Sequence, residues 1–327
     1  MDPATATDTS TAPSAEDRSP RATMIVNPYS SGMTARRERQ VVLLLREHLD
    51  LTVLRTERPN HAQDLTREAI DSGAEVVIAC GGDGTANEVT CGLDPAAGTA
   101  TERPALAVLP GGATNVLARG IGLPNDPVKA ARQLAAAIVE RRWSEFTIGK
   151  VDERAFLFCA GIGLDAETVK RKETQRRGRR SSDLAYLAAG VTQFVTTGGR
   201  IPAGMTIRAD DGDEFRAACL FCGNLDPYTY LGKIPVHLMP AARPDNGLSV
   251  VAPETLPVSL ALREASIVLS RQARRKRFND RRHDLTDVST LHVSCDMPMA
   301  VQADGEYLGD RSRITLRALP AALRIVG

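Results

Sequence analysis

No part of the sequence approaches the ~20 consecutive apolar residues that a helix needs to cross a bilayer. The longest uncharged stretch, residues 184–199, is shorter and contains several polar side chains. The chain also lacks a strong charge of either sign. Its formal net charge is only +1, which argues against a nucleic-acid-binding protein, because such proteins are usually basic. We therefore expect no membrane span and no nucleic-acid partner.

The sequence has no cysteine framework either. Its six cysteines stand singly in apolar stretches, as reduced core residues of a cytoplasmic protein do. Residues 1–20 are rich in Thr, Ala, Ser, Pro and Asp and contain no apolar run, so they predict a disordered tail rather than a signal peptide. Apolar residues make up 43% of the 327 positions and charged residues 25%, which favours a packed globular core.

The first half of the chain alternates between two hydrophobic periods. Short apolar runs typical of strands occur at residues 22–27, 51–56, 75–80 and 105–110, with helical spacing at 35–49, 61–71 and 85–91. Such alternation predicts an α/β domain with a parallel sheet that is covered on both faces. We place this domain at residues 21–147.

The second half, residues 148–317, consists mostly of short alternating runs separated by turn signals, which predicts an antiparallel β-sandwich domain. Helices are expected near residues 182–197 and 258–278. The last ten residues, 318–327, are expected to form a strand that can rejoin the first domain.

A glycine-rich turn, Gly81-Gly82-Asp83-Gly84, follows the third expected strand and leads into a helix. Ligands of parallel sheets bind beyond the carboxyl ends of the strands. Glycines let backbone N–H groups approach an anion closely, and a helix N-terminus adds favourable polarity. The carboxylate of Asp83 would repel phosphate unless it holds Mg²⁺ or orients a water or hydroxyl. The alternative is a tight turn in which Asp83 is only a local cap.

A second turn of this kind, Pro110-Gly111-Gly112, follows the fourth expected strand. Two such turns at one sheet edge can form a two-walled phosphate cradle. Neither turn is a Walker loop, since GxxxxGK[ST] is absent, and the first strand-helix turn lacks the GxGxxG dinucleotide fingerprint.

Seven ordered motifs extend over nearly the whole chain after the tail: NPYSSG (27–32), TERPNHA (56–62), GGDGTANEV (81–89), PGGATNVLAR (110–119), GIGLDA (161–166), PDNGLSVV (244–251) and QADGE (302–306). In this order they resemble the diacylglycerol kinase catalytic-domain family, which includes bacterial lipid kinases and sphingosine kinases. The resemblance implies a nucleotide-binding α/β domain, a β-sandwich-like domain and an active site between them.

The resemblance also implies roles for matching positions. In the bacterial diacylglycerol kinases the general base is the aspartate of the late DGE motif, here Asp304, with Glu306 nearby; in sphingosine kinases it is usually the aspartate of the GDG loop, here Asp83. Asp165 matches an aspartate near the lipid head group, and Asp83 is the expected metal ligand. The positions expected to contact ATP, or to support that site, are Asn27, Thr56, Gly81, Gly82, Gly84, Thr85, Glu88, Gly111, Gly112, Thr114 and Asn115.

Two positions depart from the pattern of the bacterial diacylglycerol kinases. Val116 and Thr147 stand where that subgroup has aspartates of a structural Mg²⁺ network. We do not expect that network here, whereas Mg²⁺ that arrives with ATP is unaffected by the change.

Two basic runs, residues 170–180 and 271–282, each contain seven Lys or Arg side chains. Each cation near an anionic leaflet contributes about 1 kcal/mol, so these runs favour a cytoplasmic protein that associates peripherally with an anionic membrane. Solvated faces are the alternative. A homodimer is a further option.

The sequence thus predicts an ATP- and Mg²⁺-dependent kinase that phosphorylates a lipid hydroxyl, with diacylglycerol or a sphingoid base as the acceptor. One alternative is a kinase like the NAD kinases, which share the GGDGT loop but have a different second loop. The other is a non-catalytic lipid-binding protein on the same fold, against which the intact Asp83, Asp304 and Glu306 argue.

Overall fold

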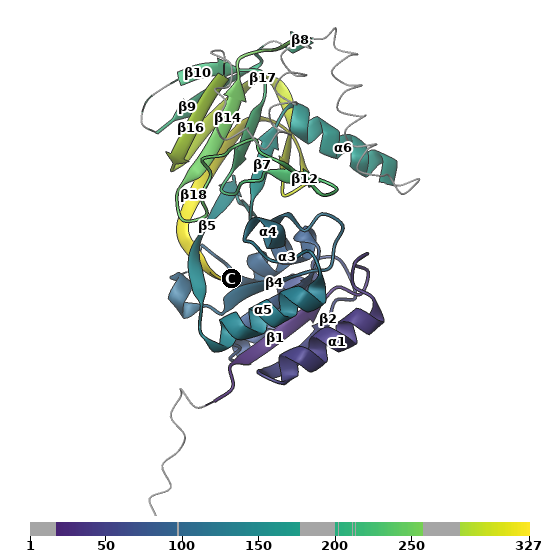
Figure 1. Ribbon diagram of the computed structural model, residues 1–327. Coiled ribbons are helices and arrows are strands. Elements are labelled where there is room, and N and C mark those ends of the chain that lie inside the picture. Colours follow the sequence, from purple (N-terminus) through teal and green to yellow (C-terminus); the bar gives the residue numbers. More distant parts are fainter. Residues whose placement is uncertain are drawn as a thin grey trace, which may run out of the picture.

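The computed structural model describes residues 18–96, 98–176, 200–201, 203–210, 212, 214–257 and 282–327. Two lobes are stacked along the long axis of the molecule (Figure 1). We call the one at the N-terminal end the α/β lobe and the other the β lobe. Residues 1–17 of the expected tail, the helices expected near 182–197 and 258–278 and most of the two basic runs lie outside the described residues.

The α/β lobe is built on four parallel strands in the order β4-β3-β1-β2: β1 (Arg21–Val26), β2 (Asp50–Arg55), β3 (Val76–Gly81) and β4 (Ala105–Pro110). Strands β3 and β4 are buried along their whole length, as the apolar runs predict for a sheet that is covered on both faces.

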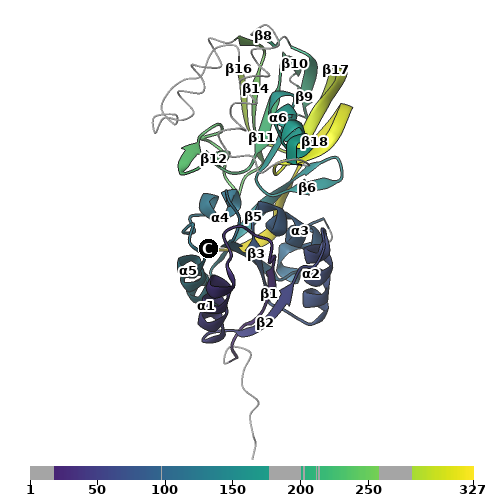
Figure 2. The same cartoon turned by 90° about the vertical axis from the view of Figure 1, so that its right-hand side faces the viewer.

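Helices cover both faces of this sheet. Figure 2 shows α1 (Ala35–Arg46) and α5 (Pro127–Val139) on one side and α2 (His61–Asp71) and α3 (Asp83–Leu93) on the other. The local sequence defines the helix starts: Thr34 accepts a hydrogen bond from the Arg37 backbone N–H, and Asp126 caps α5 just before Pro127. The short helices α4 (Val116–Gly120) and η2 (Ala100–Glu102) complete the lobe.

The β lobe is antiparallel and has a hydrophobic core of its own, which contains Phe156, Leu220 and Leu291. Its elements are β5 (Trp143–Val151), β6 (Arg154–Phe156), β7 (Cys159–Ile162), α6 (Leu164–Arg176), β8 (Arg200–Ile201), β9 (Met205–Ala209), β10 (Glu214–Ala217), β11 (Leu220–Gly223), β12 (Thr229–Leu231), β13 (Ile234–Val236), β14 (Leu248–Pro253), β15 (Leu256–Pro257), β16 (Arg282–Val288), β17 (Thr290–Ala303) and β18 (Glu306–Val326).

Two long strands join the lobes. β18 begins in the β lobe, pairs antiparallel with β5 and ends beside β4, where Ile325 pairs parallel with Leu106 (Figure 1). The hydrogen-bonded sheet is therefore continuous through both lobes. The predicted fold class, a parallel α/β half followed by an antiparallel β half, is confirmed. The limits 21–147 and 148–317 stay a prediction, and β5 passes through residue 147 without a break.

Candidate active site

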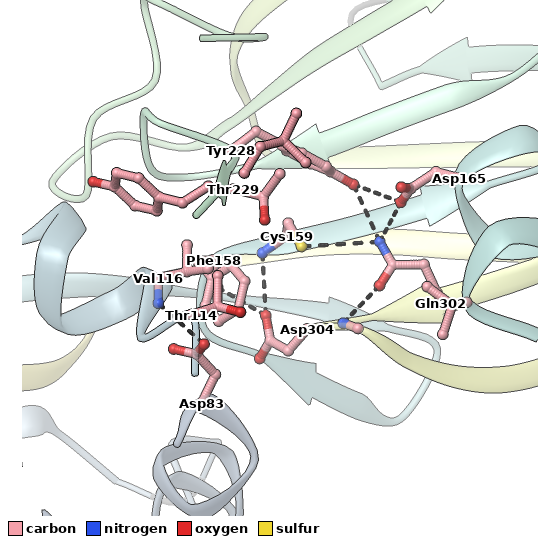
Figure 3. A pocket seen from close by; sticks show the side chains of 14 residues that line it. Asp83, Thr114, Val116, Phe158, Cys159, Asp165, Tyr228, Thr229, Gln302 and Asp304 are labelled. Carbon is pink, nitrogen blue, oxygen red and sulfur yellow. Dashed lines mark hydrogen bonds between the residues drawn. The ribbon is translucent and has the colours of Figure 1, made fainter. Parts of the chain in front are cut away.

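A cavity of about 210 Å³ lies where the lobes meet. The α/β lobe contributes Asp83, Thr114 and Val116 to its lining, and the β lobe contributes Phe158, Cys159, Asp165, Val169, Tyr228, Thr229, Tyr230, Leu231, Gln302, Asp304 and Gly305. In the view of Figure 3, Asp304 lies between Asp83 and Asp165. The structure thus brings three of the five predicted carboxylates to one cavity.

The glycine turns pack against one another, backbone on backbone. The Gly32 N–H donates to the Gly111 carbonyl, and the Gly111 N–H donates to the Gly81 carbonyl, each at 2.7 Å. A Cβ on Gly112 would meet the Gly82 Cα at 2.6 Å, a distance that real Cβ contacts do not show. These turns therefore need glycine for packing.

Gly84 differs from the other glycines of its turn. It is exposed in the first turn of α3, and a Cβ there would meet no atom of the described residues within 4 Å. Packing therefore does not explain this glycine. A ligand that must approach the start of α3 closely would explain it.

Asp83 joins the two glycine turns. Its Oδ2 accepts a hydrogen bond from the Val116 N–H at 3.0 Å, and its Oδ1 accepts one from the Leu117 N–H at 3.1 Å, so it caps α4 from a neighbouring element. Burial raises the pKa of Asp83, while these hydrogen bonds and the Arg119 charge lower it. The carboxylate thus holds the second turn in place and also faces the cavity.

Other residues of the predicted nucleotide site brace the turns. The Asn27 Nδ2 donates to the Thr85 hydroxyl at 3.2 Å, which links the end of β1 to the first turn of α3. The Asn115 Oδ1 accepts from the Gly112 N–H at 2.8 Å and so closes the second turn. Of all the positions predicted to contact ATP or to support its site, only Thr114 lines the cavity.

Two further predicted positions lie outside the cavity lining. Thr56 is buried at the end of β2, where its N–H donates to the Val26 carbonyl. The Glu88 carboxylate accepts from the Ala62 N–H at 3.1 Å and so binds α3 to the first turn of α2.

Asp304 occupies the tight turn between β17 and β18 with a φ of 48°, and Gly305 follows with a φ of 79°. Its carboxylate accepts three backbone N–H groups, from Leu157 at 2.6 Å and from Phe158 and Cys159 at 3.1 Å each. The Asn87 side chain supplies a fourth hydrogen bond at 2.7 Å. Burial raises the pKa of Asp304 to about 6, although all four hydrogen bonds lower it.

Asp165, at the start of α6, lies in a second buried cluster. Its Oδ2 accepts from the Tyr228 hydroxyl at 2.7 Å and from the Gln302 Nε2 at 2.6 Å (Figure 3). The Gln302 Oε1 accepts from the Gly305 N–H at 2.8 Å, which ties this cluster to the Asp304 turn. Burial raises the pKa of Asp165, and the two neutral donors lower it.

Glu306 does not line the cavity. Its side chain is 56% exposed and forms an ion pair with Arg154 at 2.5 Å. The structure therefore separates it from the three carboxylates that face the cavity.

The β12–β13 hairpin contributes Tyr230 and Leu231 to the cavity lining. Arg119 of α4 holds this hairpin, because it donates to the Gly232 carbonyl at 3.0 Å and its guanidinium carbon lies 3.3 Å from the centroid of the Tyr230 ring. Arg119 also donates to the Thr114 carbonyl at 3.3 Å. One side chain thus connects the second glycine turn with the hairpin.

Residues 21–151 match the profile of the diacylglycerol kinase catalytic domain. A diacylglycerol kinase from Bacillus subtilis (strain 168) is 26% identical over 301 residues, which cover 88% of this chain and 90% of that protein. Residues 21–151 thus form a diacylglycerol kinase catalytic domain, and the chain is similar to a bacterial diacylglycerol kinase over most of its length. This result confirms the resemblance that the seven motifs indicated.

Other relatives of this kinase family match over different lengths. A probable YegS-like lipid kinase from Chromohalobacter salexigens is 46% identical over 103 residues, which span only 32% of this chain and 31% of that protein. The crystal structure of a diacylglycerol kinase from Bacillus anthracis str. Sterne covers 94% of this chain and 96% of its own at a TM-score of 0.68 and 21% identity. That likeness shows the shared fold.

The two positions that depart from the diacylglycerol kinases are both buried and carry no carboxylate. The Thr147 hydroxyl has no hydrogen-bond partner among the described residues, and the Thr147 carbonyl accepts from the Asn224 side chain. Val116 packs in the core of the α/β lobe. The described residues also contain no group of three or more His, Cys, Asp or Glu that could hold a metal ion. The side chains of Val116 and Thr147 therefore do not fit a structural Mg²⁺ network.

Three side chains of the site had no assigned role at the level of sequence. Asn87 and Gln302 belong to quoted motifs, but a motif does not say that they contact Asp304 and Asp165. Tyr228 lies outside the motifs and meets Asp165 across 63 positions of sequence.

No helix in the described part of the chain is both long and apolar enough to span a bilayer.

Proposed function

We propose that the protein is an ATP-dependent lipid kinase that transfers the γ-phosphate of ATP to a lipid hydroxyl in the cavity between the lobes. The observation that carries this proposal is the position of three carboxylates, Asp83, Asp165 and Asp304, around one cavity beside the exposed start of α3. The match to a diacylglycerol kinase catalytic domain and the similarity to a bacterial diacylglycerol kinase support the same reaction.

The α/β lobe would hold ATP with its phosphates at the start of α3, where Gly84 leaves space for a close approach. Mg²⁺ in kinases is usually bound by one or two carboxylates together with the phosphates of the substrate. Asp83 fits that donor set as the one carboxylate at this edge of the cavity. Bound Mg²⁺ would neutralise charge on the transferred phosphoryl group.

Asp304 would accept the proton of the lipid hydroxyl. It lines the cavity, its orientation is held by three backbone N–H groups, and a pKa of about 6 leaves it mostly ionised at neutral pH and still basic. A general base works best when its pKa lies near the operating pH. Asp83, whose oxygens both accept N–H groups of α4, is better suited to the metal.

The lipid head group would occupy the β-lobe side of the cavity. A volume of about 210 Å³ is below the roughly 300–1,000 Å³ of pockets that enclose drug-sized ligands, so it suits a head group and leaves acyl chains outside. Asp165 with Tyr228 and Gln302 would contact that head group. The hydroxyl of diacylglycerol and the amino-alcohol of a sphingoid base are both compatible with this polar cluster.

The test is phosphate transfer from γ-labelled ATP to a panel of vesicle-embedded acceptors: diacylglycerol, a sphingoid base and an inositol lipid, with NAD as a soluble control. We expect label in one lipid class and none in NAD. Label in NAD alone would support a nucleotide kinase, and saturable lipid binding without any transfer would support a non-catalytic lipid-binding protein. Cytoplasmic location, peripheral membrane association and dimerisation stay predictions.

A further inference from the structure

One face of helix α3 reaches from the two glycine turns to the turn that contains Asp304. Asp83, Asn87 and Cys91 follow at intervals of four residues, so they lie on one side of the helix. Asp83 caps α4, Asn87 donates to Asp304, and Cys91 contacts Arg154, the ion-pair partner of Glu306. The helix that begins in the predicted phosphate turn therefore also holds Asp304.

The hydrogen bonds of Asn87 determine the orientation of its amide. The Nδ2 group donates to the Asp304 Oδ2 at 2.7 Å and to the Ala155 carbonyl at 3.2 Å, and the Oδ1 accepts from the Cys91 thiol at 3.7 Å. The opposite orientation would place the amide oxygen against a carboxylate and a carbonyl. Asn87 is only 4% exposed, so water does not compete for these contacts.

Among the four donors to Asp304 that the described residues supply, Asn87 is the one side chain and the one group from the α/β lobe. The other three donors are backbone N–H groups of the β lobe, which only a substitution by proline would remove. Asn87 is therefore the only hydrogen-bond donor that the described part of the α/β lobe supplies to this carboxylate.

We propose that Asn87 is a positioning residue, which holds the Asp304 carboxylate in its reactive orientation and in its ionised form. The proposal rests on the proposed function, in which Asp304 accepts the proton of the lipid hydroxyl. A hydrogen bond to a carboxylate favours its ionised form, so loss of Asn87 raises the pKa of Asp304.

The thiols of Cys91 in α3 and Cys159 in β7 both interact with Asp304. Asp83, Asp165 and Tyr228 line the same cavity as Asp304. Glu88, Arg154 and Glu306 surround Cys91. Arg154 and Glu306 pair with each other at 2.5 Å. Burial raises the thiol pKa of both Cys91 and Cys159, so they stay neutral near pH 7. A substitution at Asn87 removes the acceptor of the neutral Cys91 thiol and leaves the other groups in place.

The experiment compares the pH profile of kcat in the wild type and in Asn87→Leu, which keeps the branched shape of the side chain but removes the donor. A hydrogen bond to a charged group corresponds to a pKa change of about one to two units, so the acidic limb moves from near pH 6 to about pH 7–8. At pH 7 kcat falls about two- to tenfold, and it recovers at pH 9. Asn87→Ala gives the same shift.

Thr90→Val is the matched control. Thr90 lies on the same helix, is fully buried, and has a hydroxyl without a hydrogen-bond partner among the described residues, so its loss leaves the pH profile unchanged. An acidic limb that stays in place in both Asn87 variants, with a uniform loss of activity at every pH, overturns the proposal.

A second readout needs no lipid. The contribution of Asp304 to the free energy of unfolding falls as the pH rises from about 4 to about 6, because folded Asp304 binds its proton more tightly than the unfolded chain. In Asn87→Leu the decrease in the free energy of unfolding extends to higher pH. In an Asp304→Asn background the Asn87 substitution leaves the pH dependence of the free energy of unfolding unchanged. A shifted profile supports the proposal even where the tested lipids are not phosphorylated. Equal profiles in all backgrounds overturn it.

Discussion

Gly112 and Gly84 stand in the two turns at the cavity, but the structure gives them opposite physical roles. A Cβ on Gly112 would lie 2.6 Å from the Gly82 Cα, and because that neighbour is backbone, the two turns would have to separate. Such overpacking costs about 1–3 kcal/mol. At roughly 2–4 °C per kcal/mol, Gly112→Ala should lower the Tm by about 2–12 °C.

Gly84→Ala should have the opposite effects, with the Tm kept and the binding of ATP weakened. A Cβ there meets no described atom within 4 Å, and alanine in a helix is favoured over glycine by roughly 0.5–1 kcal/mol, so the Tm should stay the same or rise. The methyl group would stand where the phosphates approach the start of α3. Loss of one charge-assisted hydrogen bond, about 1.5–3 kcal/mol, should raise the KM for ATP at least tenfold.

Thermal unfolding and ATP titration of the two variants measure this division of roles. A Gly112→Ala protein as stable as the wild type would show that the turns do not pack as described. A Gly84→Ala protein with a normal KM for ATP would show that the phosphates bind elsewhere.

Two further predictions concern carboxylates of the cavity. Asp83→Asn leaves one acceptor oxygen for the N–H groups of Val116 and Leu117. This variant should lose about 1 kcal/mol in the free energy of unfolding by urea and should also have a higher KM for ATP. A loss of kcat with normal ATP binding would instead identify Asp83 as the base. Asp165→Asn should raise the KM for the lipid acceptor and change the KM for ATP little, as measured by steady-state kinetics in both substrates. An effect confined to the KM for ATP would show that Asp165 does not contact the head group.

The α/β half was predictable because it depends on local periodicity. Buried parallel strands read as apolar runs, and caps such as Asp126 before Pro127 are written in adjacent residues. The motifs also indicated that Asp83, Asp165 and Asp304 belong to one site. Their meeting at the cavity follows from a sheet in which β7 and β17 are neighbours.

The contacts of these carboxylates were not predictable from the sequence. The Gly-Gly turns suggested a phosphate cradle, yet Gly111 and Gly112 pack on the other turn, a long-range fit that no local pattern records. Tyr228 reaches Asp165 from a loop outside the motifs. Glu306 follows Asp304 by two positions, but beyond the turn it is 56% exposed and paired with Arg154.

The most direct test of the account is transfer of the γ-phosphate from labelled ATP to vesicle-embedded lipid by the wild type and by Asp304→Asn, with ATP affinity measured in parallel. General base catalysis typically contributes ~10²–10⁴-fold, so Asp304→Asn should lose kcat by that factor and keep its ATP affinity. Label in lipid at the same rate from both proteins would contradict the assignment of Asp304 as the base. No label in any lipid from the wild type would contradict the lipid kinase itself.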